Sequence, residues 1–299
     1  MIDFDLHMHS NYSSDGELTP IQLVEMAHEK GLKTIALCDH DAVAGVQEMK
    51  ESAKQFDMRI IDAIECSTVF VDHDVHLLGY GIDIEDPYFK NLSAHTRKLS
   101  RAAFYQRVHK IQEKYGIEVD VEDVIERSNG ENPWFLFFQE ILENPKYQTI
   151  PDFQDYLPGG KRCDPAPVNF FWDRCQKGSD LYVYVANPGF EETIKKIHQA
   201  GGIAIIAHPF RTFYKNEELI KKAIEAGVDG LEVYSTYHEK DHIAYYLEIA
   251  KKYDLLITCG SDFHGKKKPS IHMGEYGLDH DDGKYLETFL QAVNEHEKA

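Results

Sequence analysis

Short apolar runs that alternate with amphipathic helical segments set the narrowest limit on how this chain can fold. Most runs consist of β-branched and aliphatic residues, as expected for strands that are buried on both faces. They are Ile2–Leu6, Thr34–Cys38, Arg59–Ile64, Val75–Gly79, Ile203–Ala207, Gly230–Tyr234 and Leu255–Cys259. Strand–helix alternation is typical of a parallel sheet, so these seven runs predict a barrel close to the eight-stranded type, with a short connection between the third and fourth strands.

The alternation stops between about residues 85 and 184, where the pattern predicts a helical subdomain. A long helical pattern covers Asn91–Tyr115, and Asp120–Arg127 and Trp134–Leu142 are further helix candidates. Pro151–Asp173 is rich in proline, glycine and aromatic residues and is expected to be a loop. We therefore expect residues 1–84 and 185–299 to form the barrel, and residues 85–184 to be an insertion.

Composition and charge exclude several classes of protein. The formal net charge of -19 disfavours a broad nucleic-acid-binding surface, although cations in a pocket would still attract a small anion there. No apolar run approaches the roughly 20 residues that span a bilayer, and the N-terminus has no signal-like segment. The five cysteines form no CxxC pair, which argues against a disulfide framework. We expect a cytoplasmic protein with no membrane association.

Histidines and carboxylates gather where the expected strands end. In order along the chain, these residues are His7, His9, Asp15, His40, Glu65, His76, His208, Asp262 and His264. Because the carboxyl ends of parallel barrel strands open on one face, the six imidazoles and three carboxylates are expected to converge. Three carboxylates so close together would repel one another unless cations lay between them. The joint pattern therefore predicts a metal site, although each residue alone would more often be structural.

The residue types also limit the metal. Imidazole combined with carboxylate suits Mn, Fe or Zn, and the absence of cysteine from the set argues against a closed structural zinc site. Nine candidate ligands exceed what one ion uses, so we expect two or three divalent ions that share a bridging acid. The sequence shows neither a P-loop nor a Ser-His-Asp pattern.

At these residues the chain resembles the PHP (polymerase and histidinol phosphatase) family of metal-dependent phosphoesterases. The resemblance covers nearly the whole chain, and the helical insertion is similar to that of the stand-alone branch, which includes nucleotide phosphatases and a short-RNA exonuclease. The segments that carry it are Asp5–Ser10, Asp39–Asp41, Ile64–Glu65, His76–Tyr80, Gly201–Pro209 and Gly260–Gly265.

This resemblance implies a distorted seven-stranded (β/α) barrel and hydrolysis of a phosphate ester by a hydroxide that bridges two metal ions. It implies three sets of ligands. The first ion would be held by His7, His9, Glu65 and Asp262, the second by Glu65, His76 and His208, and the third by Asp15, His40 and His264.

Residues beside these candidates are expected to contact the substrate or support the ligands. Arg211, three residues after His208, is a candidate for bidentate binding of a phosphate group. His238 follows the sixth run and is a candidate to protonate the leaving group or contact the substrate. Asp39 is expected to orient a ligand histidine. Lys266–Lys268 form a basic run that either belongs to a solvated loop or attracts an anionic substrate.

We expect a phosphatase or phosphodiesterase that acts on a small phosphorylated metabolite, in the first place a nucleoside 5'-monophosphate or 3',5'-bisphosphate. The alternatives are a 5'-3' exonuclease on short RNA and a histidinol-phosphate phosphatase. A metal-dependent amidohydrolase and a non-catalytic metal-binding module remain further alternatives. No stable complex with nucleic acid is expected.

Overall fold

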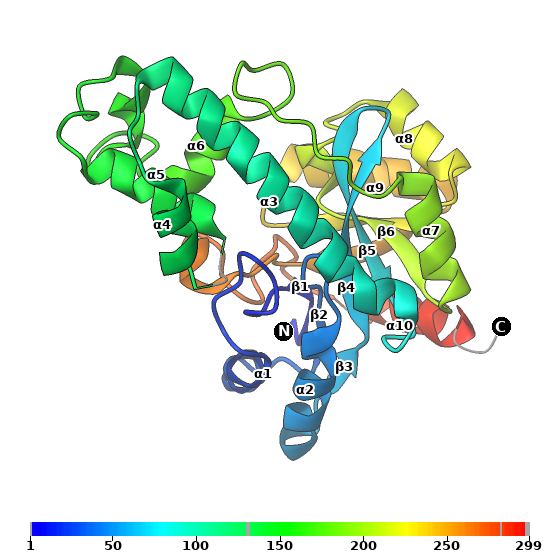
Figure 1. Ribbon diagram of the computed structural model, residues 1–299. Coiled ribbons are helices and arrows are strands. Elements are labelled where there is room, and N and C mark those ends of the chain that lie inside the picture. The colour runs from blue at the N-terminus through cyan, green and yellow to red at the C-terminus, as the bar shows by residue number, and fades with distance from the viewer. Residues whose placement is uncertain (1, 130–131, 282, 297–299) are drawn as a thin grey trace. The chain divides into compact units, whose positions relative to one another are not determined.

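The computed structural model describes residues 2–129, 132–281 and 283–296 (Figure 1). In this part of the chain the strands form two sheets. One sheet is parallel, with the order β1 (Phe4–Met8), β2 (Thr34–Leu37), β3 (Arg59–Ile61). The other has the order β4 (Ala63–Phe70), β5 (His73–Tyr80), β6 (Ile203–Ile206), β7 (Gly230–Ser235), β8 (Leu256–Gly260). In this second sheet β5 is antiparallel to both neighbours, whereas β6, β7 and β8 are parallel.

The expected barrel of seven parallel strands is therefore wrong in three respects. The third predicted run is divided at Asp62, so that β3 and β4 belong to different sheets. Val71 and Asp72 then join β4 to β5 in a tight hairpin, and both have positive φ, as the favoured two-residue hairpin turn requires. A two-residue connection can link antiparallel strands only, because a parallel pair needs a long crossover. Within the described residues the two sheets do not close into a barrel.

Isolated bridges bring the two sheets together where their strands end. Met8 pairs with Phe263, and His40 pairs with Glu65. The first bridge joins the end of β1 to the segment after β8, and the second joins the segment after β2 to β4. The strand ends that carry the candidate ligands therefore meet, even though the two sheets share no continuous ladder of hydrogen bonds.

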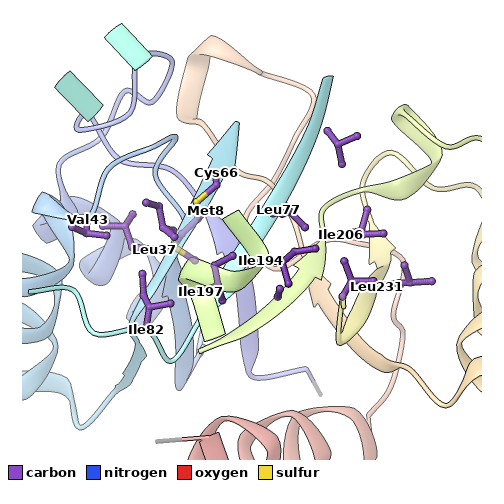
Figure 2. Close-up of a cluster of buried hydrophobic side chains, with 14 of the residues drawn as sticks. Met8, Leu37, Val43, Cys66, Leu77, Ile82, Ile194, Ile197, Ile206 and Leu231 are labelled. Carbon is purple, nitrogen blue, oxygen red and sulfur yellow. The ribbon is translucent and has the colours of Figure 1, made fainter. Parts of the chain in front are cut away.

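Helices pack against both sheets. The helices that accompany the strands in the sequence are α1 (Pro20–Glu29), α2 (Ala44–Ala53), α7 (Phe190–Gln199), α8 (Glu217–Glu225), α9 (Lys240–Tyr253) and α10 (Lys284–His296). Thr19 and Gln22 form a capping box at the start of α1, with Pro20 in the first turn. Helix α7 packs across β4, β5 and β6 (Figure 1). Its Ile194 and Ile197 join the buried cluster that Figure 2 shows with Leu77 and Ile206.

The chain packs as two compact units, Met1–Ala94 with Asn187–Ala299, and His95–Ala186. The helices beyond those above are α3 (Pro87–Tyr115), α4 (Val121–Arg127), α5 (Pro133–Glu143) and α6 (Ala166–Arg174). The second unit has its own aromatic core, which includes Phe138, Phe153 and Phe170. Helix α6 lies where a loop was predicted, because Phe170 gives this proline-rich stretch an apolar residue to bury. Among the described residues, none of the helices has the length and apolar character needed to cross a membrane.

Candidate metal centre

Two segments that are far apart in the sequence lie side by side at the site. The His9 backbone N–H donates to the Phe263 carbonyl at 2.9 Å, and the Asp262 N–H donates to the His7 carbonyl at 2.8 Å. Asp5 strengthens this junction, because its buried carboxylate accepts hydrogen bonds from the hydroxyl and backbone N–H of Ser261 at 2.6 and 2.9 Å. The end of β1 and the segment after β8 are thus fastened side by side, which places His7 and His9 next to Asp262.

The structure brings all nine candidate ligands into one cluster. Eight of them fall into three overlapping groups whose ligand atoms lie within 4.8 Å of one another. The groups are His9, Asp15, His40 and His264; His7, His9, Glu65 and Asp262; and His40, Glu65 and His76. The ninth, His208, lies outside these groups, but its Nε2 is 3.1 Å from Glu65 Oε1. These groups share His9 and His40, which the family resemblance assigns to one ion each.

Glu65 lies at the centre of the cluster and is fully buried. Its Oε1 is 3.0 Å from His76 Nδ1 and 3.1 Å from His208 Nε2. Its Oε2 faces other imidazoles, at 3.1 Å from His40 Nδ1 and 3.3 Å from His9 Nε2. Each oxygen therefore points toward a separate set of nitrogens, which is the arrangement that a carboxylate bridging two cations requires.

Several polar atoms that face the cluster have no hydrogen-bond partner within the part of the chain that the structure describes. They include Glu65 Oε2, Asp262 Oδ1 and His264 Nε2. Buried polar atoms are rarely left unsatisfied, because each then costs about 1–3 kcal/mol. Oxygen and nitrogen atoms of this kind are the ligands that Mn, Fe and Zn prefer. The residues present therefore fit a metal site.

The charges of the cluster follow from burial and from neighbouring groups. Burial, followed by the nearby His264, lowers the pKa of His9 to about 4, so its ring is neutral near neutrality and able to bind a metal. Burial opposes ionisation of Glu65, but the surrounding imidazoles, with His40 first, hold its pKa well below the usual value. Burial also opposes protonation of His40, yet Glu65 and Asp15 raise its pKa to about 10. The cluster thus supplies ionised carboxylates for cations.

Glu232 belongs to the site but was missed in the sequence. It is fully buried, and its Oε1 lies 2.8 Å from His7 Nδ1, while Oε2 accepts the His208 backbone N–H at 2.7 Å. Because a carboxylate only accepts, His7 carries its proton on Nδ1 and turns Nε2 toward the cluster. The signal in the sequence is a single carboxylate inside the otherwise apolar run Gly230–Tyr234.

Asp39 has a different role from the one expected. Its Oδ1 and Oδ2 accept from the backbone N–H and the hydroxyl of Ser10, both at 2.6 Å. These bonds fix the loop that follows His9 rather than the orientation of a ring. Burial raises the pKa of Asp39 to about 7, although both bonds to Ser10 act in the opposite direction.

Two of the candidate ligands have unusual backbone conformations. His208 has φ 29° and Asp262 has φ 57°, both in the left-handed region that favours glycine. Such residues cost on the order of 1–3 kcal/mol and persist where surrounding contacts hold them, commonly at functional sites. The Glu232 bond to the His208 N–H and the His7 bond to the Asp262 N–H are contacts of this kind.

Of the two expected substrate contacts, Arg211 lies beside the site and His238 is engaged within the fold. The Arg211 guanidinium carbon is 5.3 Å from the centre of the Tyr237 ring, and the Tyr237 hydroxyl binds Asp262 Oδ2 at 2.5 Å. His238 Nε2 accepts the Phe210 N–H at 3.2 Å, so Nδ1 carries the proton and donates to the Val233 carbonyl at 2.8 Å. Burial lowers the pKa of His238 to about 4.

Comparisons with known proteins agree with this geometry. The profile of the PHP domain matches residues 5–259. A 5'-3' exoribonuclease from Haemophilus influenzae is 31% identical over 265 residues, which cover 87% of this chain and 89% of that protein. A 3',5'-nucleoside bisphosphate phosphatase from Chromobacterium violaceum is 29% identical over 269 residues and 88% of either chain. A Bifidobacterium adolescentis structure, assigned as a metal-dependent phosphoesterase, superposes with a TM-score of 0.70 at 26% identity, covering 97% of this chain and 96% of that one.

Proposed function

Since the chain belongs to the PHP-domain family of metal-dependent phosphoesterases, we propose that it hydrolyses a phosphate ester of a small nucleotide at the cluster around Glu65. Its α/β arrangement of one parallel and one mixed sheet is the PHP fold, and the chain is a hydrolase of phosphate esters. The observation that carries the proposal is the buried carboxylate of Glu65, whose two oxygens face two different sets of imidazoles.

The three groups of ligand atoms would hold two or three divalent ions of the Mn, Fe or Zn type. We assign one ion to the group with His7 and Asp262 and a second to Glu65 with His76 and His208. A third would lie at the group with Asp15. When bound, such ions act as Lewis acids on a phosphoryl oxygen and lower the pKa of a coordinated water to about 7.

The chain's own residues would bind and orient the phosphate group. Arg211 is half-buried, and its guanidinium lies close to the ring of Tyr237, whose hydroxyl binds Asp262. A guanidinium matches the geometry of two phosphate oxygens, so we assign Arg211 to phosphate binding. With both ring nitrogens engaged, His238 is assigned to hold the Phe210 N–H, and with it the turn that carries Arg211, rather than to protonate the leaving group.

Substrate size follows from charge. A chain with a net charge of -19 repels a long polyanion, whereas one or two phosphate groups can enter a pocket where cations dominate locally. A nucleoside 5'-monophosphate or 3',5'-bisphosphate therefore fits best, and the name of the Chromobacterium relative favours the bisphosphate. Removal of nucleotides from the 5' end of very short RNA is the second candidate, favoured by the Haemophilus relative.

The test is a phosphate-release assay on protein purified with Mn²⁺. The substrates are nucleoside 5'-monophosphates, 3',5'-bisphosphates, histidinol phosphate and short oligoribonucleotides. The test variant is Glu65→Gln, which keeps the shape of the side chain and removes its charge. We expect the wild type to hydrolyse a nucleotide. The activity of the variant should be lower by at least about a hundredfold, because losing a residue that only supports a metal ligand already costs up to about that much.

Three results would contradict the proposal or redirect it. Hydrolysis of amides with none of phosphate esters would contradict it. A protein that binds metal but leaves every ester intact would favour a binding module. Release of mononucleotides from short RNA with no action on free nucleotides would favour the second candidate.

A further inference from the structure

The two carboxylate oxygens of Asp262 have different surroundings. Oδ1 faces the cluster, 2.9 Å from His9 Nε2 and 3.2 Å from His7 Nε2, and lacks a hydrogen-bond partner among the described residues. Oδ2 faces the other way, where it accepts from the Tyr237 hydroxyl at 2.5 Å and from Lys268 Nζ at 3.0 Å. One oxygen is thus available to a cation, and the other is engaged by the protein.

Tyr237 and Lys268 act as a pair, because they are also bonded to each other. Lys268 Nζ lies 3.1 Å from the Tyr237 hydroxyl. An ammonium can only donate, so the hydroxyl accepts from Lys268 and uses its single proton for Asp262. The three groups therefore form a closed set of hydrogen bonds with one possible direction each. Tyr237 lies between β7 and α9, and Lys268 follows the short turn Gly265–Lys267, so two loops converge on the carboxylate.

Lys268 differs from Lys266 in the same basic run. Its side chain is 20% exposed, whereas that of Lys266 is 92% exposed and lies 3.7 Å from Glu17. A lysine that only keeps a loop soluble would extend into water as Lys266 does. Burial of the Lys268 ammonium costs free energy unless an anion accompanies it, and Asp262 is that anion.

We propose that Tyr237 and Lys268 are positioning residues that hold Asp262 as a one-oxygen metal ligand. An oxygen that accepts from a hydroxyl and an ammonium has its lone pairs engaged, so only Oδ1 can reach a cation beside His7 and His9. This inference rests on the proposed metal site. Asp262 has φ 57°, and the two bonds to Oδ2 hold the carboxylate in place on this backbone. Without the pair, the carboxylate is free to turn and to offer both oxygens.

The test compares metal binding in Tyr237→Phe, Lys268→Met and the double variant. Lys268→Arg is the conservative rescue, and Lys266→Met is the control, because it removes the same charge from an exposed position in the same run. Co²⁺ affinity is measured by calorimetry at fixed pH, and the visible absorption spectrum of the Co²⁺-saturated protein reports the number of ligands. Melting of the metal-free protein reports on the fold.

We expect Co²⁺ affinity to fall by about 10- to 100-fold in the variants, as for loss of other outer-shell partners. At saturation, the double variant should show weaker visible absorption, because a second oxygen from Asp262 raises the coordination number. Lys268→Arg should restore the wild-type spectrum, and Lys266→Met should match the wild type throughout.

Two further outcomes separate this inference from the function on which it rests. A wild-type protein that binds no Co²⁺ would overturn the metal site itself, and the inference with it. A wild type that binds Co²⁺, with variants of equal affinity and identical spectrum, would overturn the inference alone. Lower melting temperatures combined with unchanged spectra would also overturn it, because the pair would then serve only the fold.

Discussion

Replacing Glu232 by glutamine tests how the cluster is organised, because its two oxygens serve two different donors. Oε1 accepts from His7 Nδ1 at 2.8 Å, and Oε2 accepts from the His208 backbone N–H at 2.7 Å. Glutamine has a single oxygen and can replace only one of these bonds. Its NH₂ group must then face a donor, or the His7 proton must move to Nε2, the nitrogen that faces the candidate ligands.

The size of the effect follows from burial. Glu232 is fully buried, so water cannot replace the lost bond. Hydrogen bonds to charged groups contribute about 1.5–3 kcal/mol, which corresponds to roughly one to two decades in a binding constant. If the proton moves, His7 loses its free nitrogen and the same group of ligands is weakened. We therefore expect metal affinity to fall by roughly 10- to 100-fold.

Calorimetric titration with Mn²⁺ at fixed pH measures this effect. Glu225→Gln is the matched control, because Glu225 is exposed on α8 and its replacement changes the net charge equally. The control should bind Mn²⁺ as the wild type does. A Glu232→Gln variant that also binds like the wild type would refute the assignment of Glu232 as the group that orients His7.

Two further predictions concern stability away from the cluster. Hydrogen bonding to Asp229, at 2.8 Å, raises the pKa of His198. The resulting stabilisation is complete below the unfolded pKa of about 6.5 and is lost as pH rises through the folded value, so His198→Gln should lower the melting temperature more at about pH 5.5 than at about pH 9; equal losses would contradict this. In the His95–Ala186 unit, Phe138→Ala should lower the urea-derived free energy of unfolding by about 3–5 kcal/mol; an unchanged midpoint would contradict the packing.

The convergence of the candidate ligands could be predicted from the sequence because most of them directly follow apolar runs. His7 and His9 close the first run, and strand alternation places both on one face. The candidate residues converge even though the expected barrel was wrong. His76 pairs directly with Ser67 in the antiparallel hairpin, and Ser67 shares a face with Glu65, two residues earlier. His76 and Glu65 therefore meet as diagonal neighbours, without the parallel order that was expected.

Residues that support the ligands could not be predicted, because their partners depend on register and loop conformation. Glu232 reaches His7 only because β7 lies beside β8, whose end is fastened to β1. In the sequence, Lys268 cannot be distinguished from the two lysines before it. In the structure it follows the turn Gly265–Lys267 and binds Asp262. Asp39 follows the second run beside a candidate ligand, yet the loop after His9 presents Ser10 to it instead. The bonding partner of each of these side chains depends on local backbone conformation.

A crystal structure of the protein grown with Mn²⁺ and measured at the manganese absorption edge would test the central claim most directly. We predict two or three anomalous peaks within the cluster, with Glu65 contacting two ions and Asp262 contacting one ion through Oδ1. Peaks that lie elsewhere on an active enzyme, or a Glu65 that contacts no ion in crystals that retain activity, would contradict the claim that these imidazoles and carboxylates form the catalytic metal site.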